Sequence, residues 1–380
     1  MLGSQLPSFT WLNPTRVVFG LGELARLPAL IEEVAGPRSR VFLVTGRRSL
    51  REQGVLPRVI QDIGSERLTL FDRVTPFPSA RLVDTALEAC RAASCQVVVA
   101  IGGGSVIDVA KLVAILMAHE GSLQEYASRE KQLSRSGLPV IAVPTTSGSS
   151  SEVTSGAALW DWEAKRSMNL THPLMFPTVA IVDPELTLSM PGPLAAVTGM
   201  DAFTSAFESY WSLESEPMAD ATDLEVIRLL STHLENSCIQ GDQESRAWCA
   251  LASTMSGIAY SNSHPNVCHA IGSPLTLFWE VAHGQAVGIT LPVFLKWTAP
   301  AIAHKLPALW EALGVKDLNE AIGRIDQLAE NCGLKTRLHD LGVRREGMGT
   351  LVEHTRWDRV SVLPRALGKD DLQELLQDLL

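Results

Sequence analysis

The fold is decided by one stretch of sequence, Val97-Val-Val-Ala-Ile-Gly-Gly-Gly-Ser-Val-Ile-Asp-Val-Ala-Lys111. Its opening residues, up to Ile101, are all apolar, which is typical of a strand buried inside a parallel sheet. Three glycines follow at once, and the residues after them have the apolar spacing of a helix. A strand, a glycine turn and a helix in this order predict the first half of a β-α-β unit.

Similar short apolar runs lie on both sides of this stretch. They predict strands at 15–19, 41–45, 68–71, 140–143 and 179–182, separated by helix-length segments such as 79–94 and 106–119. The alternation predicts a doubly wound α/β domain over residues 1–190. After about Leu188 apolar residues recur at helical spacing, so we expect an all-helical domain over residues 191–380. Near Pro191 we expect a packed hinge, with a cleft suited to ligands between the two domains.

Composition restricts the class of function. The chain has 380 residues, of which 46% are hydrophobic and 19% charged, and this excludes disordered and fibrous proteins. A net charge of −10 without a basic run argues against a nucleic-acid partner. Six cysteines without a CxxC pair favour a reduced intracellular protein, and neither a signal peptide nor a membrane span is recognisable. We therefore expect a soluble cytoplasmic protein that acts on a small molecule, without a membrane partner.

Two loops after predicted strands carry the residue types of a nucleotide site. Gly102, Gly103 and Gly104, followed by Ser105, would let backbone N–H groups at a helix start approach a pyrophosphate. The serine-rich loop 144–154 offers hydroxyl donors after the strand at 140–143. The alternatives are a tight turn that needs glycine only for a positive φ, and a solvated serine-rich loop. Both loops leave the carboxyl ends of strands, where open α/β sheets bind ligands.

The helical half contains three candidate metal ligands. Asp201 stands at an otherwise apolar helix start, and His269 and His283 lie fourteen positions apart among apolar residues. A carboxylate and two imidazoles suit a catalytic divalent metal with an open coordination position. The alternatives are that Asp201 is an N-terminal helix cap and that each histidine is a satisfied core residue.

These motifs together resemble the iron-containing (group III) alcohol dehydrogenase family, and the resemblance covers nearly the whole chain. It is carried by segments 102–108, 144–146, 151–154, 183–187, 199–202 and 283–284. The family implies an N-terminal dinucleotide-binding α/β domain, a C-terminal helical domain for metal and substrate, and a homodimer. It also implies one aspartate and three histidines around a divalent metal, Fe or Zn.

Carried over residue by residue, the resemblance assigns three metal ligands and leaves the fourth open. Asp201, His269 and His283 match, whereas Ser205 occupies the usual fourth-ligand position, four residues after the aspartate. A serine hydroxyl is a poor ligand beside imidazole, so water completes the site or metal affinity is reduced. Ser273 stands where the family tends to have a second histidine that serves a proton relay.

The resemblance also assigns the cofactor loops. Gly46 replaces the aspartate that many NAD-preferring relatives carry, and Arg47 and Arg48 could bind a 2′-phosphate. We therefore predict NADPH over NADH, with NADH still possible. The alternative is two solvated arginines at a helix start. Asp108 is expected to orient the glycine turn. We expect cofactor contacts from Thr145, Thr146 and Ser149.

The implied reaction is hydride transfer between nicotinamide and a carbonyl carbon, with His269, Ser273 and His283 as catalytic residues. Segments 208–214 and 269–276 are most similar to the branch that reduces phosphonoacetaldehyde to 2-hydroxyethylphosphonate. Such an anionic substrate would need cationic or hydrogen-bond-donating groups, and the candidates are His264, Asn266, Lys165 and Arg166. The alternatives are a short-chain alcohol, glycerol or maleylacetate-type dehydrogenase, a dehydroquinate-synthase-like lyase, and a nucleotide-binding protein without metal.

Overall fold

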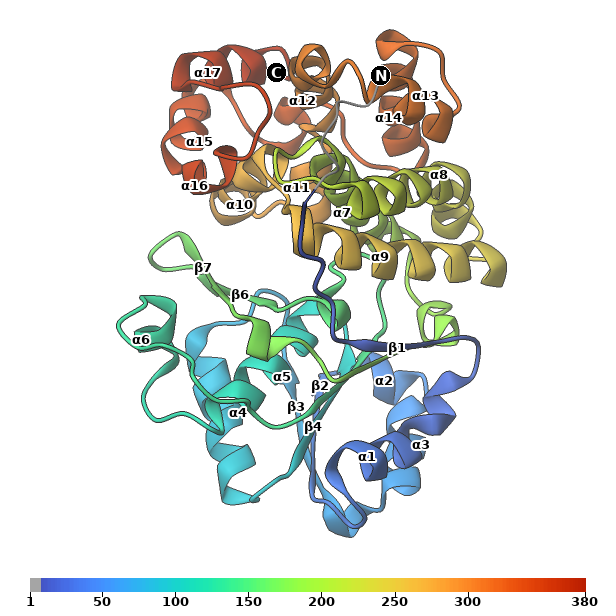
Figure 1. Ribbon diagram of the computed structural model, residues 1–380, viewed down its shortest axis with the longest axis vertical. Coiled ribbons are helices and arrows are strands. Elements are labelled where there is room, and N and C mark those ends of the chain that lie inside the picture. The colour runs from blue at the N-terminus through green and yellow to red at the C-terminus, as the bar shows by residue number, and fades with distance from the viewer. Residues whose placement is uncertain (1–7) are drawn as a thin grey trace. The chain divides into compact units, whose positions relative to one another are not determined.

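The computed structural model describes residues 8–380 and divides into two compact units (Figure 1). The α/β unit comprises Pro14–Pro191 together with Gly241–Thr254. The helical unit comprises residues 8–13, Gly192–Gln240 and Met255–Leu380. Among the described residues, we find no helix whose length and apolarity would let it cross a membrane.

The α/β unit is built on a parallel sheet of six strands in the order β1-β8-β5-β4-β2-β3. All the predicted strands are confirmed: β1 (Arg16–Phe19), β2 (Val41–Gly46), β3 (Leu68–Val74), β4 (Val97–Gly102), β5 (Val140–Pro144) and β8 (Val179–Val182). Register places Thr45 opposite Ile101 and Gly102 opposite Pro144. The loops that follow β2, β4 and β5 therefore leave the sheet side by side at its carboxyl edge.

Helices cover both faces of the sheet (Figure 1). One core joins Phe42 and Val98 to α4 (Ala80–Ala92) and α5 (Gly104–Leu116). The other core joins Leu43 and Val99 to α1 (Leu27–Ala35) and α3 (Val55–Ile63). Because neighbouring strand residues point to opposite faces, burial on both sides requires the uninterrupted apolar runs seen in the sequence. Short helices α2 (Ser49–Glu52) and α6 (Leu123–Ala127) complete this unit.

A two-stranded hairpin, β6 (Gly156–Asp161) and β7 (Arg166–Thr171), was not predicted. Its second strand reads Arg-Ser-Met-Asn-Leu-Thr, which contains no apolar run and has only Leu170 buried. The turn is closed by Lys165 in the left-handed region, at φ 49°. A pairing between half-exposed strands leaves little signal in the sequence.

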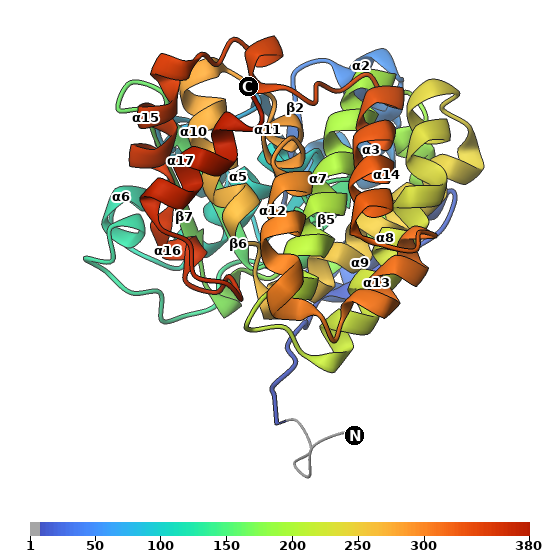
Figure 2. The ribbon, with the colours of Figure 1, turned by 90° about the horizontal axis from the view of Figure 1, so that it is seen from above.

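The second half is helical from Gly192 onward, as predicted. Its long helices are α7 (Gly192–Trp211), α8 (Pro217–Ile239) and α9 (Gln243–Ser263), and α9 begins in the α/β unit. The remaining helices are α10 (Val267–Trp279), α11 (His283–Gly288), α12 (Leu291–Thr298), α13 (Leu306–Leu313), α14 (Leu318–Asn331), α15 (Met348–His354), α16 (Trp357–Val360) and α17 (Lys369–Gln377). Figure 2 shows α8 beside α13 and α14, and α10 beside α15 and α16.

Glycine sets how closely α11 approaches α7. A Cβ at Gly284 would overlap the carbonyl of Val197, and one at Gly288 would overlap the side chain of Met200. Only glycine permits this spacing, and it brings the start of α11 against the turn of α7 that precedes Asp201.

A buried polar network ties together the first helices of this unit. Ser209 of α7 donates to Asp223 of α8 and also meets Ser263 of α9. Asp220 and Glu216 add negative charge near Asp223, and Lys305 offsets part of it. Burial raises the pKa of Asp223 well above its ordinary value, because a buried carboxylate loses its hydration.

We predict that Asp223→Asn stabilises the protein increasingly as pH rises from 4 to 8. A carboxyl whose pKa is raised on folding stabilises the folded state fully at pH values below its unfolded pKa. Above that pKa its contribution to the free energy of unfolding declines as pH rises. Asparagine does not titrate, so the variant lacks this decline. The Tm of the variant should exceed that of the native protein at pH 8 by about a degree or more, since about 1 kcal/mol moves Tm by roughly 2–4 °C in chains of 150–250 residues and by less in a longer chain. Equal pH profiles for Asp223→Asn and the exposed control Asp62→Asn would contradict the prediction.

Candidate active site

Three candidate metal ligands come together in the helical unit from three helices. Asp201 lies in the interior of α7, nine residues after Gly192, so it does not cap the helix. His269 lies in the first turn of α10, and His283 begins α11. Their ligand atoms all lie within 4.8 Å of one another.

The distance between His269 and Asp201 fits ligands of one divalent ion, whereas His283 lies farther from Asp201 than two neighbouring ligands of one ion lie from each other. Nε2 of His269 is 3.4 Å from Oδ1 of Asp201, and Nε2 of His283 is 4.0 Å from the same oxygen. Metal bonds of about 2.1 Å place neighbouring ligand atoms roughly 3.0–3.4 Å apart in tetrahedral or octahedral geometry. The donor set of one carboxylate and two imidazoles suits Fe²⁺ or Zn²⁺.

Glu208 orients His269 and was missed in the sequence. It is fully buried, and its Oε2 hydrogen bonds to Nδ1 of His269 while its Oε1 accepts the N–H of Cys268 at 2.5 Å. With Nδ1 engaged, Nε2 faces Asp201, as in a carboxylate-histidine-metal arrangement. The sequence did contain a signal for Glu208. It lies seven residues after Asp201, and this spacing places both carboxylates on one face of α7.

Opposing effects set the protonation of the cluster. Burial lowers the pKa of His269, but Glu208 and Asp201 together raise it to about 9. Burial lowers the pKa of His283 to about 4, against the opposing charge of Asp201. Burial also raises the pKa of Asp201, but the hydrogen bond and charge of His269 outweigh it, with help from His283, and lower that pKa. His283 and Asp201 are therefore deprotonated at neutral pH, the state in which they bind metal.

The two serines near the cluster have different surroundings. Ser205 is buried, and its Oγ lies 3.4 Å from Nε2 of His269, so the structure brings it to the ligand cluster. Ser273 donates to the carbonyl of His269, 3.4 Å away and one turn earlier in the same helix. Its role in a proton relay stays a prediction.

The expected anion-binding residues lie in other surroundings. His264 is exposed and pairs with Glu214 at 2.7 Å. Asn266 is fully buried and caps α10, where it accepts the N–H of Trp211 and donates to the carbonyl of Glu208. Lys165 and Arg166 belong to the β6-β7 hairpin of the α/β unit, and Arg166 pairs with Asp161.

In the α/β unit, the glycine turn packs against the serine-rich loop. A Cβ at Gly103 would lie 3.2 Å from Oγ1 of Thr146, and one at Gly104 would overlap Ser149. A Cβ at Gly102 would come within 2.6 Å of Val106. None of these three glycines has a positive φ, so space rather than backbone conformation requires them. They belong to the start of α5, and the N-terminus of a helix is where an anion is favoured.

Asp108 and Lys111 hold the serine-rich loop in place. Asp108 accepts the hydroxyl of Ser151 and the N–H of Ala158 in β6, so its bonds run to the loop and the hairpin. Lys111 is fully buried and donates to the carbonyls of Ser151 and Thr154 at 3.0 and 3.2 Å. Burial lowers the pKa of Lys111, and Asp108 opposes this effect. Lys111 had no assigned role in the sequence, because its partners are loop carbonyls that no motif reveals.

The remaining cofactor candidates lie around the same edge of the sheet. Ser105 accepts the N–H of Phe77 at 3.3 Å, and Thr145 donates its N–H to Gly102 at 3.0 Å. Gly46 ends β2, and Arg47 and Arg48 follow it with exposed side chains.

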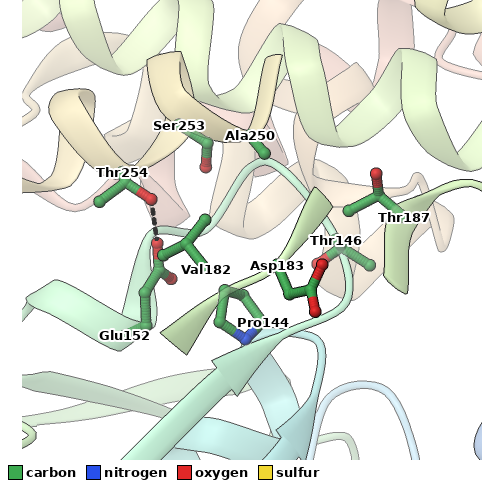
Figure 3. Close-up of a pocket in the computed structure, with 9 residues that line it drawn as sticks. All are labelled: Pro144, Thr146, Glu152, Val182, Asp183, Thr187, Ala250, Ser253 and Thr254. Carbon is green, nitrogen blue, oxygen red and sulfur yellow. Dashed lines mark hydrogen bonds between the residues drawn. The ribbon is translucent and has the colours of Figure 1, made fainter. Parts of the chain in front are cut away.

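Thr146 lines a small pocket inside this unit. In Figure 3, Glu152 turns toward Thr254 there, and the Thr254 hydroxyl donates to Oε1 of Glu152 at 2.9 Å. Burial raises the pKa of Glu152. The other lining residues are Pro144, Val182, Asp183, Thr187, Ala250 and Ser253.

Comparisons with known proteins agree with this geometry. A family model described as iron-containing alcohol dehydrogenase matches residues 14–184, and a second, for the C-terminal part of the Fe-containing alcohol dehydrogenase family, matches residues 195–380. The chain belongs to the iron-containing alcohol dehydrogenase family.

Relatives of known activity span almost the whole of this iron-containing alcohol dehydrogenase. 1,3-Propanediol dehydrogenase of Citrobacter freundii is 31% identical over 356 residues, 91% of this chain and 92% of that protein. Lactaldehyde reductase of Escherichia coli K12 is 28% identical over 370 residues, 94% and 96% of the two chains. The crystal structure of sulfoacetaldehyde reductase from Bifidobacterium kashiwanohense in complex with NAD+ has a TM-score of 0.92 at 28% identity and covers 98% and 99%. The chain is therefore an oxidoreductase of the alcohol dehydrogenase and aldehyde reductase class.

We predict that Glu208→Gln weakens divalent metal binding by about 10- to 100-fold, the usual effect of losing the partner of a ligating histidine. Glutamine keeps the size of the side chain but removes the charge that holds the imidazole. Competition with a chromophoric chelator measures the affinity, and Glu214→Gln, an exposed glutamate of the same unit, serves as control. Equal affinities for Glu208→Gln and the native protein would show that Glu208 does not organise the site.

Proposed function

We propose that the protein reduces a small aldehyde to its alcohol with a nicotinamide cofactor, and that phosphonoacetaldehyde, reduced to 2-hydroxyethylphosphonate, is the best candidate. The observation that carries the proposal is the cluster of Asp201, His269 and His283, with His269 oriented by buried Glu208. The glycine turn of the α/β unit supports the nucleotide part, because it lies between β4 and the start of α5, where a helix N-terminus favours an anion.

Asp201, His269 and His283 would hold the metal, and the loops after β2, β4 and β5 would hold the nicotinamide cofactor. When bound, the two groups supply a Lewis acid for the carbonyl oxygen and a hydride donor for the carbonyl carbon. Glu208 fixes the ring of His269, and burial keeps His283 neutral, so His283 presents a nitrogen lone pair. His269, whose pKa is raised to about 9, would release its proton when it binds the metal. Ser273 can pass a proton only after releasing the carbonyl of His269, to which it now donates.

A small anionic aldehyde is the substrate class that we propose, and one similar structure supports it. Sulfoacetaldehyde carries a sulfonate on the carbon beside the aldehyde, and the reductase of that substrate is similar to this chain along its whole length. Phosphonoacetaldehyde has the same skeleton with a phosphonate. We propose the phosphonate within this class because segments 208–214 and 269–276 resemble the phosphonoacetaldehyde branch.

The test is NADPH and NADH oxidation by purified protein against phosphonoacetaldehyde, sulfoacetaldehyde, lactaldehyde and propionaldehyde, before and after chelation and with Fe²⁺ or Zn²⁺ restored. We predict the highest kcat/KM for phosphonoacetaldehyde, with activity lost on chelation and recovered with metal. A higher kcat/KM for neutral aldehydes would overturn the substrate assignment. The protein could instead bind the cofactor and turn over no aldehyde, with or without metal. That result would favour a nucleotide-binding protein without catalytic activity, an alternative that Ser205 in the fourth-ligand position supports.

We also propose that NADPH is preferred over NADH. Gly46 places no negative charge at the end of β2, and the exposed Arg47 and Arg48 follow it at the edge of the sheet that carries the glycine turn. Arginine binds phosphate through charge-assisted, bidentate hydrogen bonds.

The double variant Arg47→Ala with Arg48→Ala should lose about 10- to 100-fold in kcat/KM for NADPH, the value of one or two hydrogen bonds to a charged group. The value for NADH should change little, because NADH lacks the 2′-phosphate. Steady-state kinetics with both cofactors measures the ratio, and a native protein that prefers NADH would refute the assignment.

A further inference from the structure

Two cysteines far apart in the sequence meet where the helices α8 and α14 end. Cys238 lies in the last turn of α8, and Cys332 directly follows Asn331, the last residue of α14. A side-chain hydrogen bond joins the two thiols, so their sulfur atoms are neighbours. Both residues belong to the helical unit, and neither is in a disulfide.

The packing of the two helices leads to the same placement. Figure 2 shows α8 beside α14. A guanidinium nitrogen of Arg324 donates to the carbonyl of Ser231 at 2.6 Å, and Nδ2 of Asn331 donates to Oε2 of Glu235 at 3.0 Å. Cys238 lies seven residues after Ser231 and three after Glu235, so it shares their face of α8. The next contact along this face therefore joins Cys238 to the end of α14.

Cys238 is the thiol of this pair that a small oxidant can reach. Of the six cysteines, all of which lie in the described part of the chain, Cys238 alone is partly exposed and the other five are buried. Oxidation of a cysteine requires access to its sulfur. We therefore expect oxidation to begin at Cys238, with the buried Cys332 beside it as the second thiol.

Cys332 is suited to react second. The hydrogen bond to Cys238 and burial raise the pKa of the Cys332 thiol, with Glu235 adding to the effect and Arg324 opposing it. Cys332 therefore keeps its proton at neutral pH, and the sulfur of Cys238 accepts the hydrogen bond. A sulfenic acid formed at Cys238 would have this thiol as its immediate neighbour, which is the arrangement of a resolving cysteine.

A second pair of neighbouring thiols, Cys90 and Cys95, is enclosed in the core of the α/β unit. The N–H of Cys95 donates to the carbonyl of Cys90 at 3.3 Å around the end of α4, and their side chains are hydrogen bonded as well. Both residues are buried, so an oxidant reaches them only through local opening of the unit. This pair has the thiol contact without the exposure, and it serves as a matched control.

We propose that Cys238 and Cys332 form a reversible disulfide when the protein meets hydrogen peroxide. The sulfur of Cys238 attacks one peroxide oxygen, the O–O bond breaks, and water leaves as Cys238 becomes a sulfenic acid. The sulfur of Cys332 then attacks the sulfur of Cys238, the S–O bond breaks, and a second water leaves with the proton of the Cys332 thiol. The two thiols lose two electrons, and these reduce the peroxide to water. A dithiol reverses the reaction by thiol-disulfide exchange.

The disulfide would close a loop that contains two of the candidate metal ligands, His269 and His283. Such a cross-link restricts the unfolded chain, and the restriction grows with the length of the loop. Oxidation should therefore raise the Tm by about 2–5 °C in a chain of this length. A transient disulfide of this kind is compatible with a protein whose cysteines are otherwise reduced.

The experiment treats the reduced native protein with a few equivalents of hydrogen peroxide and then blocks the remaining thiols with iodoacetamide. Mass spectrometry of the peptides, without reduction, identifies the linked residues. We expect a peptide pair joined through Cys238 and Cys332, lighter by two hydrogens than the separate peptides and absent after treatment with dithiothreitol. The Tm of the same samples should rise with the fraction of linked protein.

The variants Cys238→Ser and Cys332→Ser should each lose both the linked peptide and the rise in Tm. The control Cys95→Ser, which removes one thiol of the buried pair, should keep both. The proposal is overturned if the native protein forms no link, or forms one only between Cys90 and Cys95. Oxidation of Cys238 to a sulfinic acid without a link, or a link to a second copy of the chain, would overturn it as well. If the serine variants do not fold, the peptide map of the native protein decides alone.

Discussion

The candidate active site depends on the buried hydrogen bond between Glu208 and His269. One oxygen of Glu208 holds the imidazole and the other accepts a backbone N–H at the start of α10, so the carboxylate anchors both the ligand and its helix to α7. Asn266 reinforces the junction by donating to the backbone carbonyl of Glu208. A buried carboxylate is costly unless its oxygens are bonded, and here both are. The same contact therefore fixes the helix packing and the direction in which Nε2 points.

Close packing at glycines has the same role at two separate places. In the helical unit, Gly284 lets α11 approach α7 until His283 stands near Asp201. In the α/β unit, Gly103 and Gly104 let the turn after β4 pack against the loop after β5. Neither place uses the freedom of glycine to adopt a positive φ. The demand is for space, and a methyl group would push apart the elements that carry the functional residues.

The parts that could be predicted from sequence have local signals. Apolar runs identified every strand of the parallel sheet, and most clearly the central strands β4, β5 and β8, which are buried on both faces. The hairpin β6-β7 was missed because β7 is mostly polar and has only Leu170 buried, so it lacks the apolar run of a strand. Asp201 was open to interpretation as a helix cap until the start of α7 at Gly192 was known. Glu208 and Lys111 had no assigned role, because each acquires its partners only through tertiary packing.

The central claim is that Asp201, His269 and His283 bind one divalent metal, with Ser205 beside them in place of a fourth protein ligand. Anomalous diffraction at the iron and zinc edges, from crystals of protein supplied with each metal, tests it most directly. The account predicts one anomalous peak bonded to the carboxylate of Asp201 and to Nε2 of both histidines, with water rather than Ser205 completing the coordination. The absence of a peak there, or a peak held by other residues, would contradict the account.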